Sequence, residues 1–260
     1  MATKSLINLN TMIRKNTLFF GLLLGAMTVA AQQNLTIVPE KPKPGDKIEI
    51  TYTPAGEIAN TLGKVEGVVF VSGSQTRKAD DLELKKSGKK YTATIQTDTS
   101  QNFVQLGFYV DKKFDTNFGN GYYVHLYDGQ SARKGSYSSL GYFYQYYGSE
   151  SGVESDNVKA LAAFEKEFAL HPAQKRKFAV GYFRLLNSQD KDKAKSFLDD
   201  QIAAVLAAGL STEDDYTYLT SLYNAGKMND HVTRLTDEKK MKFPEGKWMV
   251  TVYVDKFFKK

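Results

Sequence analysis

Histidine, the side chain that most often moves protons in enzymes, occurs three times in this chain, and cysteine does not occur at all. His125, His171 and His231 lack the spacing of a zinc-binding pair such as His-x-x-x-His. Without cysteine the chain can form no disulfide and perform no thiol chemistry. A Ser–His–Asp site assembled in space remains a hypothesis, although no Gly-x-Ser-x-Gly motif places a nucleophile. We expect ordinary surface or partly buried histidines and no catalytic residue.

Some residues of the chain are of types that bind metal ions or phosphate. Residues 111–128 are rich in oxygen ligands, namely Asp111, Asp115, Asn117, Asn120 and Asp128. A calcium loop would need a bidentate Glu where Leu126 stands, and a hairpin turn explains Asn120-Gly121 sufficiently. Glycine-rich phosphate-binding motifs are absent, and adjacent acids such as Asp80-Asp81 are typical of a solvated surface. We therefore predict neither a metal nor a cofactor.

Six aromatic side chains close together in the sequence are the residues best suited to contact another molecule. They are Tyr137, Tyr142, Phe143, Tyr144, Tyr146 and Tyr147. Tyrosine combines a large apolar ring with a hydroxyl, so exposed members would stack on sugar rings or anchor a partner. A short helix that is apolar all round is more often buried, here as a wedge between two parts of the chain. We favour the wedge, and both roles are compatible if one edge stays open.

The N-terminus has the order of a secretory signal peptide. Arg14 and Lys15 precede the apolar run 18–27, and small residues follow at 28–31. The run is shorter than the roughly 20 apolar residues of a membrane span. We predict that residues 1–31 are cleaved after Ala31 and that the protein is periplasmic or secreted; an uncleaved anchor is the alternative.

Charge and hydropathy narrow the range of partners further. The 260 residues carry a formal net charge of +6, and removal of residues 1–31 takes away three cations and no acid, which leaves +3. Basic and acidic residues are interspersed, so no one-sided basic patch predicts nucleic-acid binding. No later segment is long and apolar enough to enter a membrane, so we expect no stable span after signal cleavage.

The first part of the mature chain has the pattern of strands. Residues 47–52 alternate polar with apolar, and 65–71, 82–85 with 91–96, and 103–110 with 122–127 are further short strands bounded by turn residues. This pattern predicts an immunoglobulin-like antiparallel β-sandwich over residues 32–135.

Beyond the sandwich the hydrophobic period becomes helical. Amphipathic helices are expected from Asp156 to the break at His171-Pro172, then up to about Leu186, and over 191–208, 214–225 and 227–240. Short loops between them predict an all-α, tetratricopeptide-like helical array over residues 136–247. The tail 248–260 has β-branched residues that favour a strand, and either docks on the array or begins a missing domain. The overall expectation is an α+β multidomain chain.

Several segments of the chain together resemble one protein family. They are residues 42–54 (PKPGDKIEITYTP), 115–122 (DTNFGNGY), 140–144 (LGYFY), 164–168 (FEKEF) and 242–246 (KFPEG). This chain resembles the N-terminal accessory region of exported thioredoxin-like thiol–disulfide oxidoreductases of Gram-negative envelopes. In that family a β-sandwich and a helical array precede a thioredoxin domain with Cys-x-x-Cys. The sequence given ends at Lys260, about where that domain would begin, and no position matches the redox motif. The resemblance suggests a helix, not a strand, for the tail.

These observations and the resemblance predict a non-catalytic exported envelope protein that acts as a protein-binding or positioning module, with other envelope proteins as partners. A carbohydrate-binding β-sandwich with a glycan partner is one alternative. A hydrolase with a spatially assembled site is the other. Two interpretations of the end at Lys260 stay open, a natural end and a truncation before a thioredoxin domain.

Overall fold

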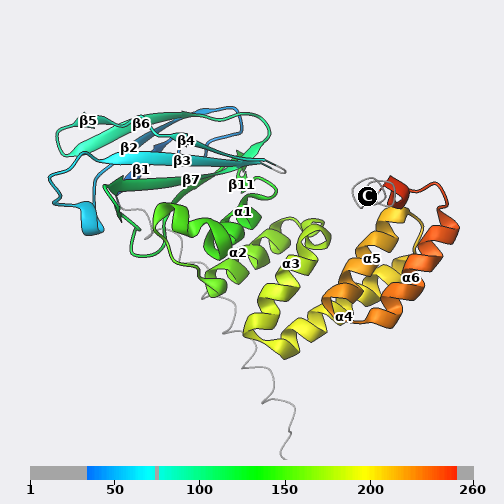
Figure 1. Cartoon of the computed structure of the whole chain (residues 1–260). Coiled ribbons are helices and arrows are strands. Elements are labelled where there is room, and N and C mark those ends of the chain that lie inside the picture. The colour runs from blue at the N-terminus through cyan, green and yellow to red at the C-terminus, as the bar shows by residue number, and fades with distance from the viewer. Residues whose placement is uncertain (1–33, 74–75, 251–260) are drawn as a thin grey trace, which may run out of the picture.

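The computed structural model describes residues 34–73 and 76–250 (Figure 1). The chain is an α+β protein in which antiparallel β-sheets come first and helices follow. In Figure 1 the sheets lie at one end, α1 and α2 lie next to them, and α4, α5 and α6 lie at the other end. The predicted signal peptide, residues 1–31, and most of the predicted tail, residues 251–260, lie outside the described residues.

One sheet has four antiparallel strands and a clear alternation of buried and exposed positions. Its order is β1 (Leu35–Val38), β2 (Lys47–Tyr52), β6 (Lys90–Gln96) and β5 (Lys85–Ser87). In β2 the residues Ile48, Ile50 and Tyr52 point to the buried face, because successive side chains of a strand alternate between faces. Ile50 lies opposite Ala93 of β6, so the predicted pattern sets the register of this pair.

The second sheet is built around the long strand β7. Its order is β4 (Arg77–Asp81), β3 (Glu66–Gly73), β7 (Gln101–Val110) and β8 (Lys113–Phe114), and β9 (Tyr122–His125) also pairs with β7. A separate small pair is formed by β10 (Tyr127–Asp128) and β11 (Ser131–Ala132), and the short 3-10 helix η2 covers Gly56–Ile58. The hairpin predicted between 103–110 and 122–127 is therefore interrupted by β8.

Two details of the predicted strands are wrong. The strand expected at 82–85 starts only at Lys85 and continues to Ser87, and the turn that follows contains Gly88 (φ 63°), which lies within the turn that residues 86–89 predict. The patterns do not predict strand β4 (Arg-Lys-Ala-Asp-Asp), because its residues from Lys78 to Asp81 are all exposed and none of the five is fully buried. Alternation cannot reveal a strand at a sheet edge with neither face buried.

The two sheets share one hydrophobic core. It combines inner-face residues of both, including Ile50 and Tyr52 of β2 and Leu106 and Phe108 of β7. The Tyr52 and Phe108 rings stack at 3.7 Å between centroids with 5° between their planes. Burying one side chain of this size completely stabilises the folded state by roughly 1.5–3 kcal/mol relative to leaving it exposed.

Strand β7 is buried on both faces. Its even-numbered residues from Val104 to Val110 belong to the core between the sheets. On its other face Phe103 belongs to the hydrophobic cluster of the helices, and Gln105 donates from Nε2 to the Tyr147 carbonyl oxygen (3.1 Å). The strand therefore connects the sheets directly to the helical part.

The helices begin after the glycine at 135 and continue to residue 242. They are α1 (Ser136–Tyr142), the π-helical turn η3 (Phe143–Tyr147), the 3-10 turn η4 (Gly148–Ser151), α2 (Asn157–Leu170), α3 (Gln174–Gln189), α4 (Lys191–Ala208), α5 (Glu213–Ala225) and α6 (Asn229–Lys242). Asp156 caps α2 and Asp190 caps α4, because each accepts from backbone N–H groups of the first turn. Thr212 and Asp215 form a reciprocal capping box at α5.

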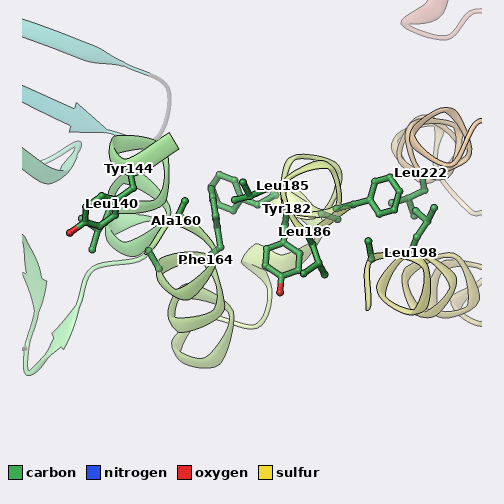
Figure 2. Packing of buried hydrophobic residues seen from close by; sticks show 14 of the residues in the cluster. Leu140, Tyr144, Ala160, Phe164, Tyr182, Leu185, Leu186, Leu198 and Leu222 are labelled. Atoms are coloured by element: carbon green, nitrogen blue, oxygen red, sulfur yellow. The ribbon is translucent and has the colours of Figure 1, made fainter. Parts of the chain in front are cut away.

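A continuous apolar cluster runs through the helices. Figure 2 shows it from Leu140 and Tyr144 through Phe164 and Tyr182 to Leu222. Gly141 belongs to this packing, since a Cβ there would lie 2.7 Å from the Phe164 ring. Close approach of α1 to α2 thus requires glycine at this position.

The start of the tail is helical. Residues 248–250 form a helical turn, and the strand that the β-branched residues favoured is not seen there. The Trp248 N–H donates to Glu213 Oε1 (2.9 Å), and the indole N–H donates to the Phe243 carbonyl (2.7 Å). The first bond docks the segment on the beginning of α5, and the second joins it to the residue that follows α6. Among the described residues, no helix combines the length and apolar character needed to cross a membrane.

Candidate binding site

The predicted aromatic cluster divides into a buried and an exposed set. Phe143 and Tyr144 are 1% and 6% exposed, whereas Tyr146 and Tyr147 are 61% and 38% exposed. The remaining two, Tyr137 and Tyr142, are partly buried and pack against the helical cluster. The structure thus places one part of the cluster as a wedge and leaves one edge open.

The buried set fills the space between the second sheet and α2. The Phe143 ring lies close to Gly121, where a Cβ would be 2.4 Å from its Cζ, and Gly121 has a φ of 70°. The Tyr144 hydroxyl donates to the Asn120 carbonyl (3.1 Å). Burial raises the pKa of Tyr144, so its hydroxyl stays protonated and remains a donor. The turn at 120–121 is therefore fixed to the wedge.

The exposed set is held in place by its neighbours. The Tyr142 and Tyr146 rings stack at 6.2 Å, and the Tyr146 and Tyr147 rings meet edge to face at 6.4 Å. The Arg77 guanidinium lies over Tyr147 (4.3 Å to the centroid) and forms an ion pair with Glu150. We call Tyr142, Tyr146 and Tyr147 the tyrosine patch.

The helix that carries the start of the cluster is fixed by a buried carboxylate. Glu167 of α2 is fully buried and accepts the backbone N–H groups of Gly135 (2.7 Å), Tyr137 (3.0 Å) and Ser138 (3.2 Å). These are amides at the beginning of α1, which have no partner within the helix. Sequence reasoning missed Glu167, although it follows Ala160, Ala163 and Phe164 on the buried stripe of α2. An acid on an apolar stripe is the signal that could have found it.

A cavity of about 600 Å³ opens beside the wedge, between the edge strand β9 and one face of α2. We call it the junction pocket. Its lining is Ile37, Glu40, Tyr123, Val124, His125, Tyr127, Tyr137, Leu140, Tyr144, Lys159, Ala162, Ala163 and Lys166. Of the predicted contact residues, the pocket brings together Tyr137 and Tyr144.

His125 is the histidine among the residues that line the pocket. Its Nδ1 shares a hydrogen bond with Ser136 Oγ (2.7 Å), and the Tyr137 ring lies 4.3 Å from the imidazole centroid. Burial, with a smaller contribution from the positive charge of Lys166, lowers the pKa of His125 to about 3. The imidazole is therefore neutral at physiological pH.

We predict that His125 stays neutral to well below pH 6, which an NMR titration of its imidazole carbon-bound protons would measure. In an unfolded chain histidine has a pKa of about 6.5, so below this pH the unfolded state binds a proton at His125 that the folded state does not bind. The contribution of His125 to stability is therefore complete above pH 6.5 and declines as the pH falls towards 3. A midpoint near pH 6.5 in the folded protein would contradict the burial argument.

The other histidines lie apart from this site. His171 Nε2 pairs with the Ala132 carbonyl (3.0 Å), and the His231 ring stacks on Tyr223 at 4.8 Å. In the part of the chain that the structure describes, none of the three hydrogen-bonds a carboxylate. A histidine that meets both a hydroxyl and a carboxylate, which the hydrolase hypothesis requires, is not found there. Ser136 itself is fully buried.

The oxygen-rich segment contains a carboxylate, Asp115, that is engaged in hydrogen bonds within the protein. Asp115 is buried and its Oδ2 accepts the hydroxyls of Tyr52 (2.7 Å) and Tyr122 (2.9 Å), whereas Asp111 and Asp128 are exposed. Within residues 34–73 and 76–250, no group of three or more acidic, histidine or cysteine side chains is arranged to hold a metal ion.

No protein-family model matches the chain, and no curated protein matches it significantly.

Proposed function

We propose that this protein is a non-catalytic, exported protein of the cell envelope that acts as a protein-binding or positioning module. The observation that carries the proposal is the division of the aromatic cluster, in which Phe143 and Tyr144 are buried while Tyr146 and Tyr147 are exposed. The buried pair fixes the helices to the sheets, and the exposed pair is then presented in a fixed orientation.

The tyrosine patch has the properties of an interface anchor. Tyrosine is enriched among the residues that contribute most to protein association, because its ring buries a large area and has few rotatable bonds. Tyr146 is 61% exposed, and Tyr147 is held by the Arg77 guanidinium. A partner would therefore meet side chains that have already lost part of their conformational freedom, which lowers the entropic cost of association.

The proposal also covers the type of β-sandwich, the type of helical array and the envelope system in which the protein acts. Two antiparallel sheets with a common core favour an immunoglobulin-like sandwich, and antiparallel helices joined by short loops favour a tetratricopeptide-like array. Together with the family resemblance, they support a role as the accessory part of an envelope thiol–disulfide system. Since the chain contains no cysteine, any thiol exchange would have to come from the partner.

Crosslinking in the periplasm of a Gram-negative host tests the proposal with the full chain. The double variant Tyr146→Ala/Tyr147→Ala is expected to reduce partner capture about tenfold or more, since anchors of this kind contribute at least 2 kcal/mol together. Phe118→Ala is the matched control, because Phe118 is an exposed aromatic residue (86%) in the turn between β8 and β9. Circular dichroism establishes that each variant is folded. Equal capture by the native chain and the double variant, or equal loss in both variants, would refute this role of the patch.

A carbohydrate-binding module is the second candidate function. It is favoured by the tyrosine rings that line the junction pocket, since aromatic faces pack on sugar rings. The charges of the pocket restrict which sugars would fit.

A further inference from the structure

The junction pocket has a charge distribution that the proposed partner binding does not use. One face of α2 supplies Lys159, Ala162, Ala163 and Lys166, which are spaced so that they lie together on a helix. The small alanines leave space between the two lysines, and the long lysine stems can reach across it. The cavity volume of about 600 Å³ lies within the range of small-molecule sites.

Both ammonium groups face aromatic walls of the pocket. Lys166 Nζ lies 4.4 Å from the centre of the Tyr137 ring, and Lys159 Nζ lies 5.3 Å from that of Tyr144. Lys159 is already engaged, since it donates to the Gly119 carbonyl (3.0 Å) and pairs with Asp156 (3.7 Å). Lys166 has no carboxylate within 4 Å in the described part of the chain, so its charge is available to a ligand.

Besides the lysines and tyrosines, the lining of the pocket contains one acid, Glu40, and one neutral imidazole, that of His125. Glu40 is exposed, so the lining itself carries two ammonium groups and one carboxylate. His125 uses Nδ1 for Ser136, while its Nε2 makes no hydrogen bond to the described residues. The floor is apolar, with Val124 and Leu140 buried beneath. A ligand that fits this lining has an apolar or ring-shaped body and a negative group at one end.

We propose that the junction pocket binds a small organic carboxylate whose ring packs against Tyr137 and Tyr144 and whose negative group is held by Lys166. The site is separate from the tyrosine patch, so the inference stands independently of partner binding. Two sources share this chemistry, an aromatic acid and an acidic sugar.

Calorimetric titration of the full mature chain with matched probe pairs tests the proposal. The pairs are 2-naphthoate with 2-naphthamide and D-glucuronate with D-glucose, and in each pair only the acid carries a charge. We expect at least one acid to bind about tenfold or more tightly than its neutral counterpart, as one charge-assisted hydrogen bond would give. Binding of naphthoate alone indicates an aromatic acid, binding of glucuronate alone indicates an acidic sugar, and either supports the site.

Two variants and one spectroscopic signal assign the binding to this pocket. Lys166→Gln is expected to abolish most of the preference for the acid, whereas Lys193→Gln, an exposed lysine of α4, leaves it within about twofold. The bound acid should also shift the imidazole signals of His125 and not those of His231, which lies on α6. The proposal is overturned if neither acid binds at millimolar concentration, if acid and neutral probe bind equally, or if Lys166→Gln changes nothing.

Discussion

Replacement of Glu167 by alanine is expected to lower the free energy of unfolding by about 3–5 kcal/mol, because three buried amides lose their acceptor. The carboxylate bonds the N–H groups of Gly135, Tyr137 and Ser138, and Glu167 itself is fully buried. Removing the side chain also leaves a cavity between α1 and α2. Urea denaturation followed by circular dichroism measures the change.

Two further variants separate the hydrogen bonds of Glu167 from general effects. Glu167→Gln keeps the volume and one acceptor oxygen, so we expect an intermediate loss of stability. Glu238→Ala, at an exposed position of α6, should change stability by no more than about 0.5 kcal/mol. A loss below about 1 kcal/mol for Glu167→Ala would show that water or a shifted helix satisfies the amides.

The second large effect is expected at Asp115, whose replacement by alanine should also cost about 3–5 kcal/mol. Its carboxylate accepts the hydroxyls of Tyr52 and Tyr122 and the backbone N–H groups of Ala55 (3.0 Å) and Asn117 (3.0 Å). The tyrosine hydroxyls are themselves buried in the core between the sheets. Thermal and urea unfolding of Asp115→Ala measure the loss, with the exposed Asp81→Ala of β4 as control.

A triple variant makes the cause of the Asp115 effect testable. When Tyr52→Phe and Tyr122→Phe are added to Asp115→Ala, the hydroxyls that had lost their acceptor are removed as well. Replacing both partners of a buried hydrogen bond by apolar groups costs less than removing one of them. The triple variant should therefore be more stable than Asp115→Ala alone, and an additive further loss would contradict the argument.

Much of the fold follows from local patterns in the sequence. The alternation in residues 47–52 predicts β2 with its observed bounds, since only one face of that strand meets the core. The apolar stripe and the glycine at 209 predict α4 over residues 191–208, again with its observed bounds. The edge strand β4 escapes prediction because nothing on either of its faces is buried.

The candidate site depends on contacts between distant parts of the chain and is only partly predictable. Composition alone reveals the aromatic cluster, but which rings are buried depends on how α1 packs on β7 and α2 and how η3 packs on α2. The junction pocket joins His125 of β9, Tyr137 of α1 and Lys166 of α2, and no local pattern links these positions. Burial of the outer face of β7 is equally hard to predict, since Gln105 interrupts the apolar residues there and bonds to Tyr147 and Ser151 far along the chain.

Because β7 is buried on both faces, the sheets and the helices depend on each other when the protein unfolds. Phe103 and Val104 are neighbours in one strand, yet each is covered by a different layer. If the helices melt, Phe103 becomes exposed and Gln105 loses its bonds to Tyr147 and Ser151. We therefore expect sheets and helices to denature in a single cooperative transition. In a fragment cut near residue 135, the outer face of β7 would become a solvent-exposed apolar surface, which favours self-association.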